Sequence, residues 1–339
     1  MDLKRFLQFG FSLLVGGVLL WLSFRHVDWN EAKANLSQVT AWGVLLYCLA
    51  FGLQWVARTL RWRLQIEATN EVKPPLQLAL CINVVAMAAV FFVPLRLGEL
   101  VRPYLCRKYK LAKMSEALAH SAVERVTDGI VTTAFLLFVL FMMPKENLPD
   151  VIFNGAWIAA GIFLGGVCFL GFAYFWRQPA LNLLTRCLFF APVGLKGKLI
   201  GLLETFLDGI SCFANWKAFF AYLFYTGLFW GLNGWSMWFL IDLMGIDVPV
   251  TAGFFAMCCL VLGVMVPAPP ANVGNFEYAI LVGVTPFGLS ASVAAAFAFL
   301  LHTIQLLMML TVAVLIISVG GVSLAGIRDG RDEPSPEEA

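Results

Sequence analysis

Long apolar segments separated by short polar connections make up most of this chain. Their lengths approach the roughly 20 residues that a helix needs to cross the hydrocarbon core of a bilayer. The six predicted spans cover residues 7–24, 41–57, 129–143, 151–175, 218–241 and 290–319. The third span continues a helix that begins near residue 115. Shorter amphipathic helices are predicted at 27–39 and, on the inner membrane surface, within 177–217.

Two further apolar segments, 76–110 and 251–286, are each broken near the middle. In both, a proline is followed four residues later by a glycine, with a glutamate just beyond; the glycines are Gly98 and Gly274. Proline removes a helical N–H and glycine is conformationally loose, so each helix is predicted to end there. Broken backbone at membrane depth persists only where protein buries it or water reaches it. We therefore predict two re-entrant helical hairpins.

The positions of the basic residues predict how these segments are oriented. If the first hairpin enters and leaves from the cytoplasm and the second from outside, all but Arg25, Lys33 and Lys145 of the 23 Lys and Arg residues are cytoplasmic. Both termini are then cytoplasmic. Two spans, a hairpin and a span occur twice, in opposite orientations, as in inverted-repeat transporters. The predicted units are 1–146 and 147–322, followed by a disordered tail at 323–339.

The predicted fold class is thus an all-α polytopic membrane protein with about six full spans plus two re-entrant helical hairpins from opposite faces. Composition agrees, because 60% of the residues are hydrophobic and 13% are charged. The net charge of +2 does not indicate nucleic-acid binding. The eight cysteines have no metal or redox spacing and are interpreted as packing residues. No cofactor, metal site, phosphate-binding glycine loop or nucleophile motif is predicted.

Polar residues at the two breaks and on the helix after the first break are the candidate substrate-binding residues. They are Arg96, Glu99, Arg102, Glu124, Arg125, Asp128, Asn272, Asn275 and Glu277. Arg96 and Arg102 suit phosphate, because guanidinium matches a phosphate group bidentately. Arg102 also lies three residues after Glu99, so the two would share a helix face and form an ion pair as the alternative.

Glu124 and Asp128 are four residues apart, an unfavourable pairing of like charges unless a cation joins them. Either Arg96, Arg102 or Arg125 supplies that cation and locks the hairpin to the helix, or the two acids receive a cationic headgroup. Glu277 has no positive partner nearby in the sequence. Asn272 and Asn275 are predicted to line a polar path with it. His302 is interpreted as a hydrogen-bonded histidine of the core, with a proton relay as the alternative.

Three motifs resemble the flippase-like membrane domain of the lysylphosphatidylglycerol synthase family, also called the multiple peptide resistance factor family. They read Pro94-x-Arg96-x-Gly98-Glu99-x-x-Arg102, Glu124-Arg125-x-x-Asp128 and Pro270-x-x-x-Gly274-x-x-Glu277. The resemblance covers roughly residues 5–322. It implies a bacterial inner-membrane protein that moves lipids between leaflets. The expected partner is an anionic or aminoacylated phospholipid, or a polyprenyl- or hopanoid-type lipid; a homodimer is also among the expected assemblies.

Full-length members of that family carry an aminoacyltransferase domain after the membrane part, and this chain ends without one. We therefore expect a lipid flippase or scramblase rather than an enzyme. An ion-coupled small-solute transporter is an alternative, since it too fits inverted repeats. A membrane glycosyltransferase or lipid-modifying enzyme is another. Its acids would lie at the outer surface, where the sequence offers Asp28, Glu31, Asp242 and Asp247.

Overall fold

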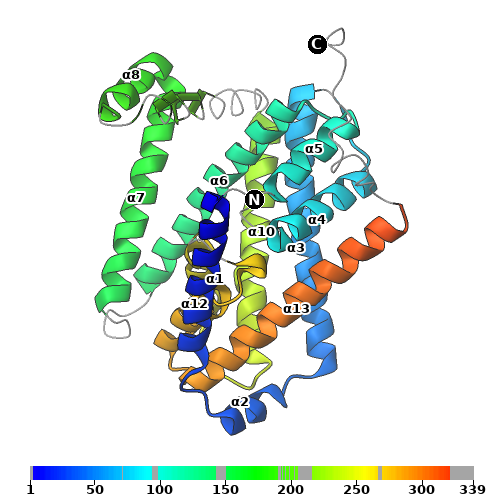
Figure 1. The fold of residues 1–339 in the computed structure, drawn as a ribbon, viewed down its shortest axis with the longest axis vertical. Coiled ribbons are helices and arrows are strands. Elements are labelled where there is room, and N and C mark those ends of the chain that lie inside the picture. The colour runs from blue at the N-terminus through cyan, green and yellow to red at the C-terminus, as the bar shows by residue number, and fades with distance from the viewer. Residues whose placement is uncertain are drawn as a thin grey trace.

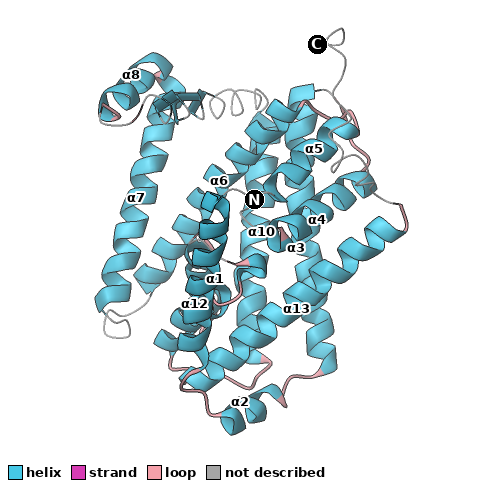
Figure 2. Ribbon diagram, viewed as in Figure 1, coloured by secondary structure: helices cyan, strands magenta, loops and turns pink. Residues whose placement is uncertain are grey.

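The computed structural model describes residues 3–70, 72–93, 98–142, 150–189, 216–265 and 269–320, with nine further residues between 192 and 204. In this described part the chain forms helices joined by loops, and no strand occurs (Figure 2). The all-helical prediction is therefore confirmed for these residues. The predicted tail at 323–339 and the interrupted stretch at 94–97, which holds Arg96, lie outside them.

The helices follow the predicted order closely. In the first half they are α1 (Leu3–Phe24), α2 (Trp29–Leu36), α3 (Ala41–Asn70), α4 (Leu76–Phe92), α5 (Val101–Lys108) and α6 (Met114–Met142). In the second half they are α7 (Asp150–Phe175), α8 (Arg177–Cys187), α10 (Trp216–Asp242), α11 (Thr251–Gly263), η3 (Pro270–Asn272), α12 (Asn275–Val284), η4 (Thr285–Phe287) and α13 (Ala291–Ser318).

Side-chain caps fix several helix starts. The Asp28 carboxylate accepts the Asn30 N–H at the start of α2, and the Ser290 hydroxyl accepts the Val293 N–H at the start of α13. At α12 the Glu277 carboxylate, in the first turn, accepts the Gly274 N–H at 2.6 Å. Each contact satisfies a backbone donor that the helix itself leaves unpaired. In this apolar chain such caps set where a helix begins more sharply than the hydrophobic pattern does.

A central group of helices carries the fold (Figure 1). Within it α3 packs along α10, α10 packs on α11, and α13 crosses α2, α4 and α12. α7 lies to one side, where it packs on α6 and on α8 (Figure 1). The largest buried apolar cluster joins α10, α11, α12 and α13, and a second joins the later half of α3 with α4 and α5. The charged site described below lies beside this second cluster.

Three helices in the described part are both long and apolar enough to cross a membrane, at Ala41–Thr69, Met114–Met142 and Ala291–Ser318. A fourth qualifies if Gly10–Phe24 and Trp29–Leu36, which meet at an angle of 86°, count as one bent span. This falls below the predicted six. α10 has 27 residues and reaches about 40 Å, enough to cross, but its Trp, Asn and Gly content lowers its hydropathy.

Both interrupted segments form pairs of short helices. α4 packs against α5, and α11 packs against α12. The tip of the second pair, at η3, contacts α4 of the first. The two segments expected to form hairpins therefore touch each other, and their re-entrant arrangement stays a prediction. Their sidedness in the membrane stays a prediction.

The two motif glycines lie where no side chain fits. A methyl group on Gly98 would overlap the backbone carbonyl of Ala89 in α4. One on Gly274 would overlap the carbonyl of Gly16 in α1, and Gly274 has a positive φ of 89°. Gly98 thus lets the chain fold back against α4, whereas Gly274 lets α1 pack on the second hairpin.

Replacing Gly274 with alanine should destabilise the protein more than the same change at Gly288. Gly288 has φ 88° and ψ 6°, the left-handed helical conformation, where alanine costs about 1–2 kcal/mol, and Gly274, with φ 89° and ψ −52°, lies outside that region, where alanine is no less strained. A methyl group at Gly288 meets nothing within 4 Å, whereas at Gly274 it adds an overlap worth about 1–3 kcal/mol. Thermal melting of the two variants in detergent measures the difference. Equal melting temperatures would contradict the packing of α1 on this hairpin.

Cysteine accessibility tests the predicted sidedness. Lys73→Cys and Lys113→Cys flank the first hairpin and should react with an impermeant thiol reagent only from the cytoplasm, whereas Val250→Cys and Pro286→Cys should react only from outside. The background replaces Cys168 and Cys187, which are exposed, and Cys212, which lies outside the described residues. If the two flanks of either hairpin label from opposite sides, that segment spans the membrane.

Candidate functional site

The later half of α3 brings two arginines into the protein interior. The second predicted span was expected to end near residue 57, with Arg58 and Arg61 outside the membrane on the cytoplasmic side. The helix itself continues to Asn70, so both arginines lie within it. Trp62 and Ile66, which follow in the same helix, are fully buried, and so is Arg61. Their apolar burial keeps the helix packed and holds the arginines inside.

Arg61 pairs with Asp128 on α6. Its Nη1 donates to Oδ1 of Asp128, and its Nη2 lies 3.3 Å from Oδ2. The indole N–H of Trp230 on α10 donates to the same Oδ1 at 2.9 Å. The ring of Tyr222, also on α10, lies 5.7 Å from the guanidinium. Asp128 thus links three helices, because it accepts from α3 and from α10.

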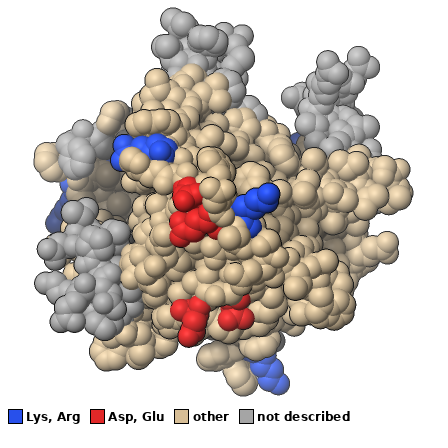
Figure 3. Space-filling model, turned by 90° about the horizontal axis from the view of Figure 1, so that it is seen from below, with Lys and Arg blue, Asp and Glu red and all other residues tan. Residues whose placement is uncertain are grey.

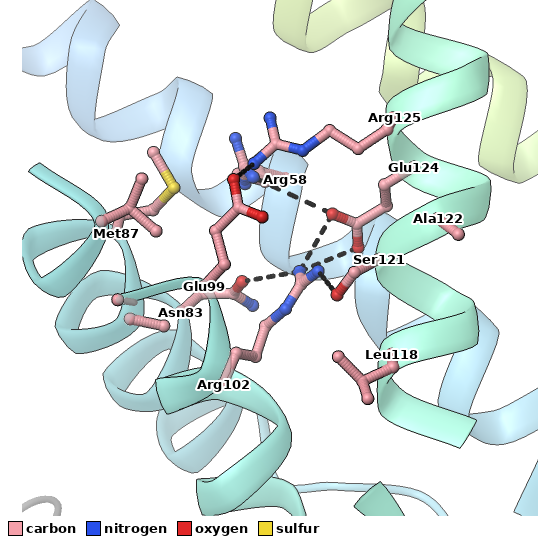
Figure 4. A pocket seen from close by; sticks show the side chains of 13 residues that line it. Arg58, Asn83, Met87, Glu99, Arg102, Leu118, Ser121, Ala122, Glu124 and Arg125 are labelled. Carbon is pink, nitrogen blue, oxygen red and sulfur yellow. Dashed lines mark hydrogen bonds and ion pairs between the residues drawn. The ribbon is translucent and has the colours of Figure 1, made fainter. Parts of the chain in front are cut away.

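Arg102 pairs with the other acid of α6. Its Nη1 lies 2.9 Å from both carboxylate oxygens of Glu124, and its Nη2 donates to the Ser121 hydroxyl at 2.7 Å (Figure 4). Its guanidinium lies 5.7 Å from the Trp62 ring. Arg102 therefore fixes α5 to α6, and it is not paired with Glu99. Glu99 instead accepts from Arg125 at 3.3 Å, and both of these side chains are exposed.

The cluster holds one more positive than negative charge. Three guanidiniums, on Arg58, Arg61 and Arg102, face two carboxylates, on Glu124 and Asp128. Arg58 is the least compensated, because its Nη2 is 3.9 Å from Glu124, farther than Arg61 and Arg102 lie from their carboxylates. Its buried Nε, like that of Arg61, has no hydrogen-bond partner in the described part of the chain. A buried cation without a full counter-charge favours an anion beside it.

A pocket opens at this cluster between α3, α4, α5 and α6 (Figure 4). Its volume is about 230 Å³. It is lined by Arg58, Asn83, Ala86, Met87, Val90, Gly98, Glu99, Arg102, Leu118, Ser121, Ala122, Glu124 and Arg125. Small-molecule pockets commonly measure roughly 300–1,000 Å³, so this one suits a polar group rather than a whole large ligand.

The α4 side of the pocket is mainly apolar, whereas most of its charged residues come from the other helices. Ala86, Met87 and Val90 come from α4, and Leu118 adds an apolar contact from α6. The ion pair of Glu99 and Arg125 stands at the exposed edge, with side chains 43% and 59% accessible. An amphiphilic group would find charged partners on one side and apolar contacts on the other.

The remaining predicted residues gather at the second hairpin, away from this pocket. Glu277, expected to lack a positive partner, pairs with His302 on α13: its Oε1 lies 2.6 Å from Nδ1 of the ring. The other ring nitrogen faces the Ala271 carbonyl at 2.9 Å. Asn275 is buried and donates to the Gly263 carbonyl at 3.3 Å, which ties α12 to α11. Asn272 has a left-handed backbone, with φ of 55°, at the tip.

The structure thus divides the nine predicted site residues. Five of them, Glu99, Arg102, Glu124, Arg125 and Asp128, lie in or beside the pocket; Asn272, Asn275 and Glu277 belong to the second hairpin; and Arg96 lies outside the described residues. Of the cations proposed for the two acids, Arg102 serves Glu124. Arg61, which was not considered, serves Asp128.

Sequence reasoning missed Arg58 and Arg61 because it took them as markers of the cytoplasmic side. A signal was present, since Trp62 and Ile66 continue an apolar face four residues apart beyond the first arginine. An apolar face that runs past an arginine indicates that the helix stays packed there.

The fold is that of a helical membrane protein with paired short helices and a charged internal pocket. The sequence profile of the family described as "Lysylphosphatidylglycerol synthase TM region" matches residues 10–313, so the chain belongs to that family. This confirms the resemblance and associates the protein with membrane lipids. It is similar to "UPF0104 membrane protein MJ1078" of Methanocaldococcus jannaschii, with 22% identity over 191 residues, 56% of this chain and 75% of the relative. No solved structure matches.

Arg61→Ala should strongly destabilise the fold, because it leaves Asp128 buried without its cation. Breaking a buried pair in this way costs about 3–5 kcal/mol. Arg63→Ala, two residues along the same helix, is the matched control: Arg63 pairs with Glu67 at a partly exposed position, where a pair contributes about 1 kcal/mol or less.

Thermal melting and folded yield in detergent measure both variants. The double change Arg61→Leu with Asp128→Asn should recover part of the loss, since neither charge then remains alone. Equal melting temperatures for Arg61→Ala and Arg63→Ala would show that the Arg61–Asp128 pair does not support the fold.

Proposed function

We propose that this protein translocates phosphate-containing lipids between membrane leaflets, and that the pocket at Arg58 binds their headgroups. The observation that carries the proposal is the uncompensated positive charge at Arg58, which faces a pocket with an apolar wall. A phosphate diester carries one negative charge. It would balance the three guanidiniums and two carboxylates of the cluster to zero.

The size and chemistry of the pocket support a headgroup in particular. A volume of about 230 Å³ accommodates a phosphate and a small substituent but not acyl chains. Glu99 at the exposed edge is a carboxylate that an amine of a zwitterionic or aminoacylated headgroup would meet, in competition with Arg125. The apolar wall on α4 suits the glycerol and the first carbons of the chains.

Translocation requires that a headgroup cross without losing its polar partners. The cluster supplies fixed charges in place of water, which lowers the desolvation penalty of the phosphate. α4 connects this site with the second hairpin, because it carries Asn83 and Met87 of the pocket and also contacts η3. Movement of the second hairpin would therefore reach the pocket through α4. This supports alternating exposure of the headgroup to the two sides.

The alternatives have weaker support. Two of the acids that a lipid-modifying enzyme would use lie at the end of the molecule near α2 (Figure 1), and both have structural roles. Asp28 caps α2, and Glu31 accepts the Ser290 hydroxyl at 2.7 Å. The face seen from below carries only small groups of acidic and basic side chains on a largely uncharged surface (Figure 3). A small-solute transporter would also use the charged pocket, but its substrate would gain nothing from the apolar wall.

Arg58→Gln should slow headgroup translocation without unfolding the protein. Its charge is the least paired of the cluster, so its removal strands no carboxylate, because Glu124 keeps Arg102 and Arg61. Losing a charge-assisted hydrogen bond of about 1.5–3 kcal/mol should reduce the rate by roughly 10-fold to 100-fold. Arg63→Gln on the same helix removes an equal charge away from the pocket and should leave the rate unchanged.

The measurement uses proteoliposomes with fluorescent phosphatidylglycerol, phosphatidylethanolamine or diacylglycerol, whose outer-leaflet dye is quenched by an impermeant reductant. Wild-type protein should increase the rate at which the two phosphate lipids move between leaflets, relative to protein-free vesicles, more than it increases that of diacylglycerol. Wild-type rates no faster than protein-free vesicles would refute translocation. Equal rates for Arg58→Gln and wild type would remove the pocket from the mechanism. Uptake of labelled glycerol phosphate into the vesicles, without any lipid movement, would favour the small-solute transporter.

A further inference from the structure

The His302 ring lies between two hydrogen-bond acceptors. Nδ1 is 2.6 Å from Oε1 of Glu277, and Nε2 is 2.9 Å from the carbonyl oxygen of Ala271. A neutral imidazole has only one N–H, so it can donate to one of these oxygens and not to both. With Glu277 ionised, the lone pair of the other nitrogen would face an oxygen lone pair at hydrogen-bond distance.

Both contacts are satisfied only if the pair holds one additional proton. The pair is then an imidazolium beside a carboxylate, or a neutral imidazole that accepts from a carboxylic acid. Either form carries the same proton and no net charge. Glu277 and His302 are 5% and 3% exposed, so loss of this proton would leave a net negative charge away from water.

The surroundings offer no other charge to compensate such a loss. Of the elements packed around the pair, α4, α11, α12, η3, α13 and the described side chains of α1 carry no other charged group. The other groups on these elements that can lose a proton are three thiols and a phenol, on Cys81, Cys258, Cys259 and Tyr278.

Three more helices contact α13, and their charged groups lie elsewhere. On α3, Tyr47 accepts from Gln305, one turn beyond His302. The arginines of α3 have other partners: Arg58 and Arg61 pair with the two acids of α6, and Arg63 pairs with Glu67. On α2, Glu31 binds Ser290 at the start of α13, and Lys33 is exposed. On α10, Lys217 and Asp242 lie at the two ends of the helix and are also exposed.

The pair also holds an unusual piece of backbone. Ala271, Asn272 and Gly274 all have positive φ, and the first and last of these contact the pair directly, through the Ala271 carbonyl and the Gly274 N–H. Phe276 stacks on the His302 ring at 4.1 Å. For alanine a left-handed conformation persists only where surrounding contacts enforce it. The contact to His302 is one such constraint.

We propose that Glu277 and His302 form a proton-binding site that latches the tip of the second hairpin to α13. With the proton bound, His302 holds the Ala271 carbonyl. When the proton leaves, one of the two contacts becomes repulsive and the tip is released. The tip contacts α4, so release would alter the packing of the helix that lines the pocket. Proton binding here does not depend on the lipid proposal and is tested without it.

Glu277→Gln keeps the contacts that hold the hairpin tip but removes the carboxylate that can bind a proton. The glutamine amide can donate to Nδ1 of a neutral His302, whose Nε2–H still donates to Ala271, while the amide oxygen accepts the Gly274 N–H. All contacts of the protonated pair are thereby kept without a group that titrates. The variant should be latched at every pH, whereas wild type should be latched only while the proton is bound.

Hydrogen–deuterium exchange of the 271–278 amides, in nanodiscs, measures release. At each pH from about 5 to about 9 the wild-type rate is divided by that of Glu277→Gln, which cancels the intrinsic pH dependence of exchange. The ratio should be near one at the acidic end and rise at least about tenfold at the alkaline end. Glu67→Gln, the same change at a partly exposed position, should behave like wild type.

A ratio that stays constant over the whole range would overturn the proposal. A second reference guards against misfolding of the first: the double change Glu277→Gln with His302→Gln removes both groups that can hold the proton, and the wild-type rate divided by its rate should show the same step with pH. A step between the double variant and Glu277→Gln would place the proton elsewhere and would equally overturn the proposal. Loss of lipid transport in either variant bears only on the proposed function.

Discussion

Pairing of charge inside an apolar protein is the constraint on which this structure depends. Asp128 and Glu124 project from one face of α6, and neither could be buried alone without a penalty of several kcal/mol. Arg61 and Arg102 supply the counter-charges from α3 and α5, and Trp230 adds a donor from α10. The positions of four helices are therefore coupled through two carboxylates. The apolar clusters pack beside these ion pairs.

The charge of the pocket follows from the same network, which contains more arginines than carboxylates. Two acids cannot neutralise three arginines, and the surplus falls on Arg58, the residue whose guanidinium lies farthest from a carboxylate. A network built only for stability would gain from a third acid or from an apolar residue at this position. The surplus is therefore easiest to understand as an affinity for an anion, kept at some cost to the fold.

Local sequence signals were sufficient to locate the breaks but not the partners. Proline, glycine and charge within an apolar segment placed both interruptions, and the structure has short helices on either side of each. Spacing offered Glu99 as an alternative partner for Arg102, three residues away, yet the pairs observed at the pocket join residues 22 to 67 positions apart. Such pairs depend on which helices become neighbours, and all the helices here are similarly apolar. His302 was correctly expected to be hydrogen-bonded, but its partner was not foreseen for the same reason.

The long separations also constrain the order of events during synthesis. Arg61 emerges 67 residues before Asp128, so the later half of α3 cannot settle in an apolar environment until α6 has followed it. Until then its arginines belong at the aqueous surface, and the two helices must enter their final positions together. α1 has a longer interval, because Gly16 packs against Gly274 near the end of the chain. α1 precedes the other described helices in the chain but is thus among the last to find its place, and it must remain in the membrane as a separate helix until the second hairpin has been translated.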